Sequence, residues 1–207
     1  MSLTVAIFPY GPLQENTYVV TDAETGFRAV IDPGYFGNDV KEEIGDNSNL
    51  KFILLTHGHY DHFAAVRQYI QEYPEAMFII PAGEHYLLYE GTVNQAMAGG
   101  PAGKCPDADK TVSEGDVIEL GKTSFRVIET PGHTEGGVCY VTDTEMFSGD
   151  TLFRLSVGNT SFETGDWATL VRSIQNKLFT LPEELIVYSG HGQPTSIGFE
   201  KRANPFV

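Results

Sequence analysis

Three histidines and an aspartate are crowded into the six residues from His57 to His62, directly after the apolar run Phe52–Leu55. Such a run is typical of a buried strand, and polar groups left without partners at its end would be costly. Neutral imidazole and carboxylate are preferred ligands of zinc, iron and manganese. The segment is therefore interpreted as half of a metal centre, which requires a fold that brings further ligands to this strand end.

Three other strand-like runs end in a similar way. Each is followed by a glycine-flanked His or Asp: His133 after Ser124–Ile128, Asp150 after Met146–Ser148, and His191 after Leu185–Tyr188. Glycine lets the backbone turn sharply and approach closely, so these side chains are expected to converge on one point. The remaining histidine, His85, has a context that favours an ordinary surface or core residue.

Strand-like and helical patterns follow one another along the chain, which favours a mixed α/β architecture. The segment 61–72 has its apolar residues at helical spacing, so Asp61 and His62 would project into the site from the first turn of a helix. Further helices are expected at Asn38–Ile44 and Trp167–Leu178. The expected strands are Val5–Phe8, Tyr18–Val20, Phe27–Ile31, Phe52–Leu55, Met77–Ile80, Val117–Leu120, Phe125–Ile128, Val138–Val141 and Ile186–Tyr188.

Length and charge narrow the class of protein. With 207 residues, 41% of them hydrophobic, the chain is long enough for one domain with a sizeable core. Its net charge of −15 disfavours nucleic acid as a partner. No apolar run approaches the roughly 20 residues that span a bilayer, and no signal-peptide pattern is present. Cys105 and Cys139 are interpreted as free thiols, which favours the cytoplasm.

Together these motifs resemble the metallo-β-lactamase superfamily, and within it the glyoxalase-II-like hydrolases. The resemblance covers nearly the whole chain and rests on Asn16–Tyr18, Ile31–Gly34, Thr56–His62, Pro131–Thr134, Gly149–Phe153 and Gly190–Gly192. It implies an α/β fold of the four-layer αββα sandwich type, formed by residues 1–207 as a single metallo-β-lactamase-like domain.

The resemblance also implies a centre of two divalent metal ions, zinc in the first place, with iron or manganese as alternatives. The implied ligands are His57, His59 and His133 for the first ion, Asp61, His62 and His191 for the second, and Asp150 as a bridge between them. Asp150 argues against the β-lactamases proper, which place Cys or Ser at this point. Gly58 argues against the flavodiiron branch, which has an acidic residue there.

Hydrolysis is the reaction expected of such a centre. Paired divalent ions lower the pKa of a water to about 7 and polarise a substrate carbonyl. Asp150 would hold the ions at the correct separation, and Asp61 would orient the attacking water, so both are interpreted as catalytic residues. Asp32 either fixes a histidine tautomer or caps a turn before Pro33.

The substrate implied by the resemblance is a small-molecule thioester such as S-D-lactoylglutathione, cleaved to a hydroxy acid and a thiol. Glyoxalase II enzymes carry a C-terminal helical domain, whereas this chain stops at Val207 and is more similar to short single-domain members. Asn159 stands where a cation would pair with a glutathione carboxylate, and charge-assisted contacts are about twice as strong as neutral ones. Arg154 lies nearby in sequence and is an alternative cation.

Other functions remain open at this stage. An iron-dependent persulfide dioxygenase would share much of the motif but needs one iron held by two His and one Asp. A lactonase would use the same machinery on another ester. A non-catalytic metal module is disfavoured because structural zinc sites are usually rich in thiolates. The segment Gly91–Asp109 is either a lid, with Tyr86, Tyr89 and Met97 beside it as an apolar wall, or a solvated loop. Oligomeric state is not indicated.

Overall fold

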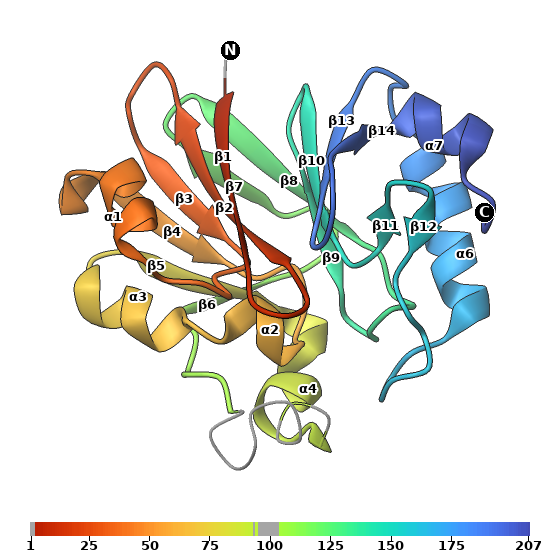
Figure 1. Ribbon diagram of the computed structural model, residues 1–207, viewed down its shortest axis with the longest axis horizontal. Helices are drawn as coiled ribbons and strands as arrows, with labels where there is room; N and C mark the ends of the chain where they lie inside the picture. Colours follow the sequence, from red (N-terminus) through yellow and green to blue (C-terminus); the bar gives the residue numbers. More distant parts are fainter. Residues whose placement is uncertain (1–2, 93, 95–103) are drawn as a thin grey trace.

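Two six-stranded sheets form the centre of the protein, and helices cover their outer sides (Figure 1). The computed structural model describes residues 3–92, 94 and 104–207. The first sheet has the order β1-β2-β3-β4-β5-β6 and belongs to the first half of the chain. Its strands are β1 (Leu3–Tyr10), β2 (Glu15–Asp22), β3 (Arg28–Ile31), β4 (Leu50–Leu54), β5 (Met77–Pro81) and β6 (Lys110–Val112).

The second sheet belongs to the second half of the chain and has the order β14-β13-β10-β9-β8-β7. Its strands are β7 (Val117–Leu120), β8 (Thr123–Glu129), β9 (Val138–Val141), β10 (Glu145–Gly149), β13 (Ile186–Ser189) and β14 (Thr195–Ser196). A separate small hairpin joins β11 (Leu152–Phe153) to β12 (Ser156–Val157).

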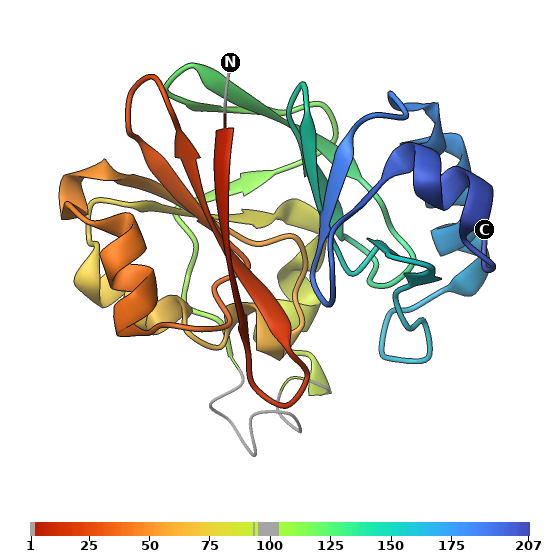
Figure 2. The same ribbon diagram turned by 45° about the horizontal axis from the view of Figure 1, so that its top comes forward.

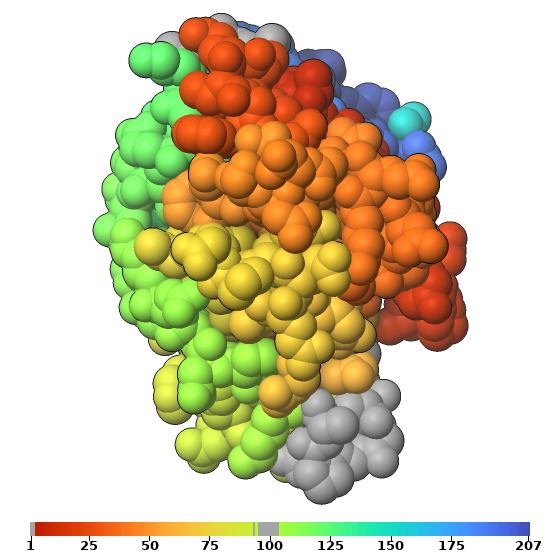
Figure 3. All heavy atoms as spheres, turned by 90° about the vertical axis from the view of Figure 1, so that its left-hand side faces the viewer, coloured from red at the N-terminus to blue at the C-terminus, as the bar shows by residue number. Residues whose placement is uncertain are grey.

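The helices lie outside the two sheets, as the turned view shows most clearly (Figure 2). Those of the first half are α1 (Asn38–Ile44), α2 (Tyr60–Phe63), α3 (Val66–Glu72) and α4 (His85–Tyr89). Those of the second half are α6 (Trp167–Asn176) and α7 (Ile197–Ala203). Short 3-10 turns occur at Asn47–Asn49, Ala82–Glu84 and Leu178–Thr180. In the space-filling view of one side, α1 (orange) and α3 (yellow) cover the first sheet (Figure 3).

Three apolar layers hold the elements together. Leu54 and Ile79 of the first sheet pack between the sheets with Phe125 and Phe147 of the second. A second layer packs the first sheet against α1 and α3, and a third packs the second sheet against α6 and α7. Strand β2 is buried at seven of its eight positions, although only its middle residues Tyr18–Val20 are apolar. The expected αββα sandwich is confirmed.

Strand direction explains why the histidine-bearing loops meet. Strands β8 and β10 are both antiparallel to β9, and β10 is parallel to β13, so β8, β10 and β13 run the same way. Their carboxyl ends therefore lie at one edge of the second sheet. In the first sheet β3 and β4 are parallel, so the loops that follow them also share an edge. Ligands bind at such strand ends in open α/β sheets.

Most of the expected elements are present, with a few corrections. The helix expected over 61–72 is interrupted, because Ala65 has φ −104° and ψ 2° and its N–H donates to the carbonyl of Pro33. The helix expected to reach Leu178 ends at Asn176 and is followed by a 3-10 turn. Strands β6, β11, β12 and β14, of two or three residues each, and helices α4 and α7 were not predicted.

The interpretation of Gly91–Asp109 as a lid concerns mainly Val93 and Gln95–Gly103, which lie outside the described residues, as does Met97. Tyr86 and Tyr89 belong to α4 and line neither described cavity beside the histidines. Both cysteines are buried and free. None of the helices in the described part of the chain combines the length and apolar character needed to span a membrane.

Candidate metal centre

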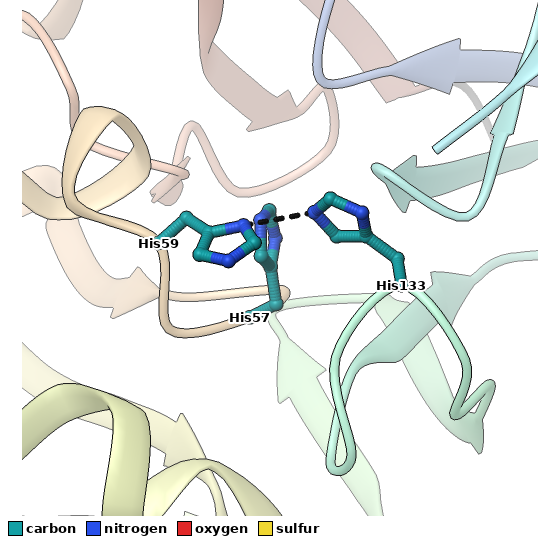
Figure 4. Close-up of side chains that lie close together, drawn as sticks. All are labelled: His57, His59 and His133. Atoms are coloured by element: carbon teal, nitrogen blue, oxygen red, sulfur yellow. Dashed lines mark hydrogen bonds between the residues drawn. The ribbon is translucent and has the colours of Figure 1, made fainter. Parts of the chain in front are cut away.

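Three histidines from two different loops face one another at the edge between the sheets (Figure 4). His57 and His59 lie in the loop after β4, and His133 lies in the loop after β8. One nitrogen of each lies within 4.8 Å of those of the other two. Nδ1 of His59 is 2.8 Å from Nε2 of His133. This trio is the set of side chains predicted for the first ion.

A second set lies beside the first. Asp61 and His62 come from α2, and His191 comes from the loop after β13. Their ligand atoms also lie within 4.8 Å of one another. The carboxylate of Asp150 faces both sets: Oδ1 is 3.4 Å from Nε2 of His62, and Oδ2 is 3.5 Å from Nε2 of both His133 and His191. All seven predicted ligands are thus brought together, whereas His85 is exposed on α4 and faces Tyr89.

The outer nitrogens of four rings are held by the surrounding protein. Nδ1 of His62 lies 3.0 Å from Oδ2 of Asp32, and Nδ1 of His57 lies 3.0 Å from Oγ1 of Thr56. Nδ1 of His133 is 2.8 Å from the carbonyl of Asn159, and Nδ1 of His191 is 2.9 Å from the carbonyl of Leu13. Such contacts fix the orientation of each ring and leave Nε2 directed inward.

Asp32 has a structural basis for this role. Its carboxylate also accepts hydrogen bonds from the backbone N–H and the hydroxyl of Thr56, both at 2.7 Å. Its backbone lies in the left-handed region with φ 51°, a conformation that aspartate tolerates better than most residues and that is common at functional sites. Of the two interpretations of Asp32, the geometry matches the one in which it orients a histidine.

The charge states of the side chains suit cation binding. Burial holds the pKa of His57 and His133 below the usual value and lowers that of His59 to about 4, so all three rings are neutral at pH 7. Burial acts the same way on His191, but hydrogen bonds with Asp150 and Asp61 outweigh it and raise the pKa of His191 to about 10. The neighbouring histidines hold the pKa of Asp150 well below its usual value despite burial. His191 is therefore protonated at pH 7 when no cation is bound to the second set.

Unpaired buried atoms test whether metal ions fit here. Nε2 of His57 and His62 and Oδ1 of Asp150 are buried without a hydrogen-bond partner. Such atoms are rare in native proteins and call for a ligand. A set of imidazoles and carboxylates without thiolates suits divalent zinc, iron or manganese. The residues present fit two divalent ions.

Sequence reasoning missed the side chains that hold the first set in place. Glu84 is fully buried and accepts hydrogen bonds from the backbone N–H of Gly58 at 2.7 Å, the hydroxyl of Thr134 at 2.6 Å and the N–H of Gly136 at 2.8 Å. The amide of Asn94 donates to the carbonyl of Gly58 at 2.6 Å. Burial raises the pKa of Glu84 to about 7, although these hydrogen bonds lower it.

Gly58 shows why a glycine separates the first two histidines. A Cβ at this position would lie 2.6 Å from Oε2 of Glu84 and 3.0 Å from Cβ of Leu87. The peptide of Gly58 is thus held from both sides, by Glu84 and Asn94, in a space that excludes a side chain. In the sequence, Gly58 was used only to argue against the flavodiiron branch, and its buried partner Glu84 was not predicted.

Asn16 supports the other end of the centre. Its amide donates to the carbonyls of Ser189 and Gly192, both at 3.0 Å, and its backbone N–H donates to the carbonyl of Gly190 at 2.8 Å. These bonds fix the loop that carries His191. The motif containing Asn16 was part of the predicted resemblance, but its role was not.

A cavity of about 320 Å³ opens above the centre. It is lined by Leu13, His59, Asp61, His133, Asp150, Phe153, Asn159, Phe162 and His191. The side chain of Asn159 accepts hydrogen bonds from the N–H and hydroxyl of Ser161, so it shapes the loop. The guanidinium of Arg154 lies over the ring of Phe199, 5.5 Å from its centroid, and does not line this cavity.

Comparison with known proteins agrees with this architecture. A model of the metallo-beta-lactamase superfamily matches residues 10–191, and the chain belongs to this superfamily. Hydroxyacylglutathione hydrolase GloC of Haemophilus influenzae is 34% identical over 214 residues, covering 99% of this chain and 98% of that protein. The family predicted from the motifs is thereby confirmed.

Solved structures of other proteins share the fold of this chain. The structure of BLEG-1 B3 metallo-beta-lactamase matches with a TM-score of 0.88 at 33% identity, covering 98% of this chain and 99% of that one. The structure of TTHA1623 in a di-iron-bound form matches with a TM-score of 0.84 at 32% identity, covering 98% of this chain and all of the other. The fold is shared along nearly the full length of each.

Proposed function

We propose that this protein is a dinuclear-metal hydrolase that cleaves a thioester of the S-D-lactoylglutathione type to a hydroxy acid and a thiol. The observation that carries the proposal is the placement of Asp150, whose two carboxylate oxygens face the two ligand sets. The similarity to a protein named hydroxyacylglutathione hydrolase supports the choice of a thioester.

The roles of the residues follow from their positions. The ligands would be His57, His59 and His133 for one ion, Asp61, His62 and His191 for the other, with Asp150 shared. Two bound divalent ions would lower the pKa of a water molecule and would polarise the thioester carbonyl. Asp61 lines the cavity and its pKa is lowered, because neighbouring histidines outweigh its burial, so its carboxylate is free to accept a hydrogen bond from the attacking water.

Zinc is the proposed metal, and the similarity to a di-iron protein keeps iron as the first alternative. The proposed partner is a small-molecule thioester rather than nucleic acid, since the net charge of −15 repels a polyanion. The two buried free cysteines support a cytoplasmic location, where thiols stay reduced.

The test is thiol release by purified protein loaded with zinc, manganese or iron, before and after treatment with a chelator. The substrates are S-D-lactoylglutathione and the D-lactoyl thioester of N-acetylcysteamine. Metal-dependent release from either thioester is the expected result. Metal-loaded protein that releases thiol from neither refutes the proposal. Oxygen uptake on glutathione persulfide would then identify a dioxygenase, and cleavage of a chromogenic β-lactam would identify a lactamase.

A further inference from the structure

A second cavity adjoins the one above the metal centre. It measures about 250 Å³ and is lined by residues of the loop that joins β1 to β2 and of helix α2. Both elements can be located in Figure 1. Tyr10, Leu13 and Tyr60 contribute apolar walls, and Asp61 is among its lining residues. Leu13 and Asp61 line both cavities. The two cavities are therefore adjoining lobes of one cleft, and the candidate catalytic carboxylate of Asp61 lies where they meet.

The walls of both lobes are apolar side chains left open to solvent. Leu13 is 54% exposed and Tyr10 is 55% exposed, although the Tyr10 ring stacks on that of Tyr35 at 4.2 Å. In the lobe above the metals, Phe153 and Phe162 line the wall, and Phe162 is 46% exposed. Exposed aromatic and aliphatic side chains gathered around a concave site are typical of a surface that binds apolar ligands.

The charged groups of the cleft are all acidic, apart from its histidines. Asp61 and Asp150 line the lobe above the metals, and Glu15 lines the second lobe. Glu15 is 3% exposed, and its Oε1 has no hydrogen-bond partner. In the metal-loaded protein Asp61 and Asp150 would face the ions, so their charge would be compensated there. A substrate carboxylate that enters the apolar lobes would lose its hydration without gaining a charged partner, which is costly.

No lysine or arginine among the described residues lines either lobe. The undescribed residues 1–2, 93 and 95–103 contain neither type. The nearest cation in sequence, Arg154, packs on Phe199, and the side chain of Asn159 is bound to Ser161. Glutathione carries two carboxylates, and the cleft offers neither of them an ion-pair partner.

We infer that the two lobes form one substrate cleft for thioesters free of carboxylates, with the second lobe binding an apolar arm of the substrate. This inference rests on the proposed function and narrows its substrate class. In the reaction, water adds its oxygen to the acyl carbon, the carbon–sulfur bond breaks, and the departing sulfur takes a proton to give an acid and a thiol. Glutathione thioesters are then poor substrates for reasons of charge.

The first experiment compares D-lactoylglutathione with the same thioester of glutathione diethyl ester, which keeps the skeleton and removes both carboxylates. We expect kcat/KM to be about tenfold higher for the diethyl ester, because it has no carboxylates that must lose hydration in the apolar lobes without a charged partner. In a series of N-acylcysteamine thioesters, each further methylene that enters the second lobe adds up to about fourfold. Equal or higher kcat/KM for free glutathione, with no gain from added methylenes, overturns the inference.

Substitutions at Leu13 test the assignment to this cleft. Leu13→Lys places a cation between the lobes and should shift the ratio of the two kcat/KM values toward free glutathione by about fivefold, whereas Leu13→Asp should shift it the other way. Val117→Lys is the matched control: this residue is 47% exposed on β7, lines neither lobe and adds the same charge. A ratio that Leu13→Lys and Val117→Lys change equally contradicts the assignment.

A binding measurement separates failure of this inference from failure of the proposed function. S-hexylglutathione and its diethyl ester are thioethers that cannot be hydrolysed, so their dissociation constants from the metal-loaded protein do not depend on catalysis. Tighter binding of the diethyl ester, weakened both by the charged Leu13→Asp and by the neutral polar Leu13→Gln, supports an apolar cleft even if no thioester is cleaved. Tighter binding of the free acid refutes the inference whatever the activity.

Discussion

Glu84 joins the two loops that carry the first three histidines. Its Oε2 accepts from the N–H of Gly58, between His57 and His59, and its Oε1 accepts from Thr134 and Gly136, just after His133. The N–H of Val138 also donates to the carbonyl of Thr56 at 2.8 Å, so Glu84 adds three side-chain hydrogen bonds to this backbone link. Replacing Glu84 should therefore loosen the first ligand set without removing a ligand.

The size of the effect follows from the unpaired groups. Glu84→Ala leaves two buried backbone N–H groups without acceptors, which costs about 2–5 kcal/mol of unfolding free energy. Glu84→Gln keeps the shape, but in either amide orientation its NH₂ faces a backbone N–H, so it costs about 1–3 kcal/mol. A total stability of about 10 kcal/mol, the middle of the usual range, would leave both variants folded. Loss of such an outer contact lowers metal affinity by about 10–100-fold.

The assay combines urea unfolding of metal-free protein with competition for zinc against a coloured chelator. Glu90→Ala is the matched control, because Glu84 and Glu90 cap opposite ends of α4 and Glu90 is exposed. Gly58→Ala adds a second test, since its Cβ would lie 2.6 Å from Oε2 of Glu84. Its cost should shrink in the Glu84→Ala background by about 1 kcal/mol. Native zinc affinity in Glu84→Gln, or additive costs in the double variant, would refute the reasoning.

Three further outcomes are expected. Asp150→Ala should abolish hydrolysis and reduce the amount of bound metal measured by elemental analysis. His85→Ala, at an exposed position, should change neither. Full activity of Asp150→Ala would exclude the dinuclear centre. Asn16→Ala should lower the affinity for one of two zinc ions by about tenfold in chelator competition, because the loop that carries His191 loses two hydrogen bonds from the Asn16 amide. Two unchanged zinc affinities would contradict this prediction. The pKa of Glu84 is about 7 when folded and near 4.5 when unfolded, so its stabilising contribution is complete below pH 4.5 and is lost as pH rises through 7. The unfolding free energy of the metal-free native protein relative to Glu84→Gln should therefore fall by about 3 kcal/mol from pH 4.5 to 8, and a rise would show the sign to be wrong.

The position of the centre could be predicted because strand ends carry the information. A histidine or aspartate flanked by glycine after an apolar run has few other uses, and His133, Asp150 and His191 all follow strands that run in one direction. Strand direction itself was not available from the sequence. The convergence was inferred from residue type and was supported by a family resemblance, which the comparisons confirm.

The supporting side chains could not be predicted, because their partners are distant in sequence. Glu84 contacts Gly136, which lies 52 residues further along the chain, and Asn16 contacts Ser189 at a separation of 173. A single glutamate or asparagine in an irregular segment carries no periodic signal that reports such a contact. The same holds for Asn159, which was interpreted as a missing cation and proves to support its own loop through Ser161.

The two ligand sets do not correspond to the two sheets, and this couples the centre to the fold. The loop and helix after β4 supply His57, His59, Asp61 and His62, whereas the second sheet supplies His133, Asp150 and His191. Each set is therefore complete only when the two sheets are packed against one another as in this structure. Tyr18 is one residue that holds the two sheets together. Its ring packs between them, and its hydroxyl donates to the carbonyl of Ser189, two residues before His191, at 2.5 Å. Ions that bind only when both sheets are docked stabilise the whole sandwich in proportion to their affinity, so the core and the metal centre form one cooperative unit.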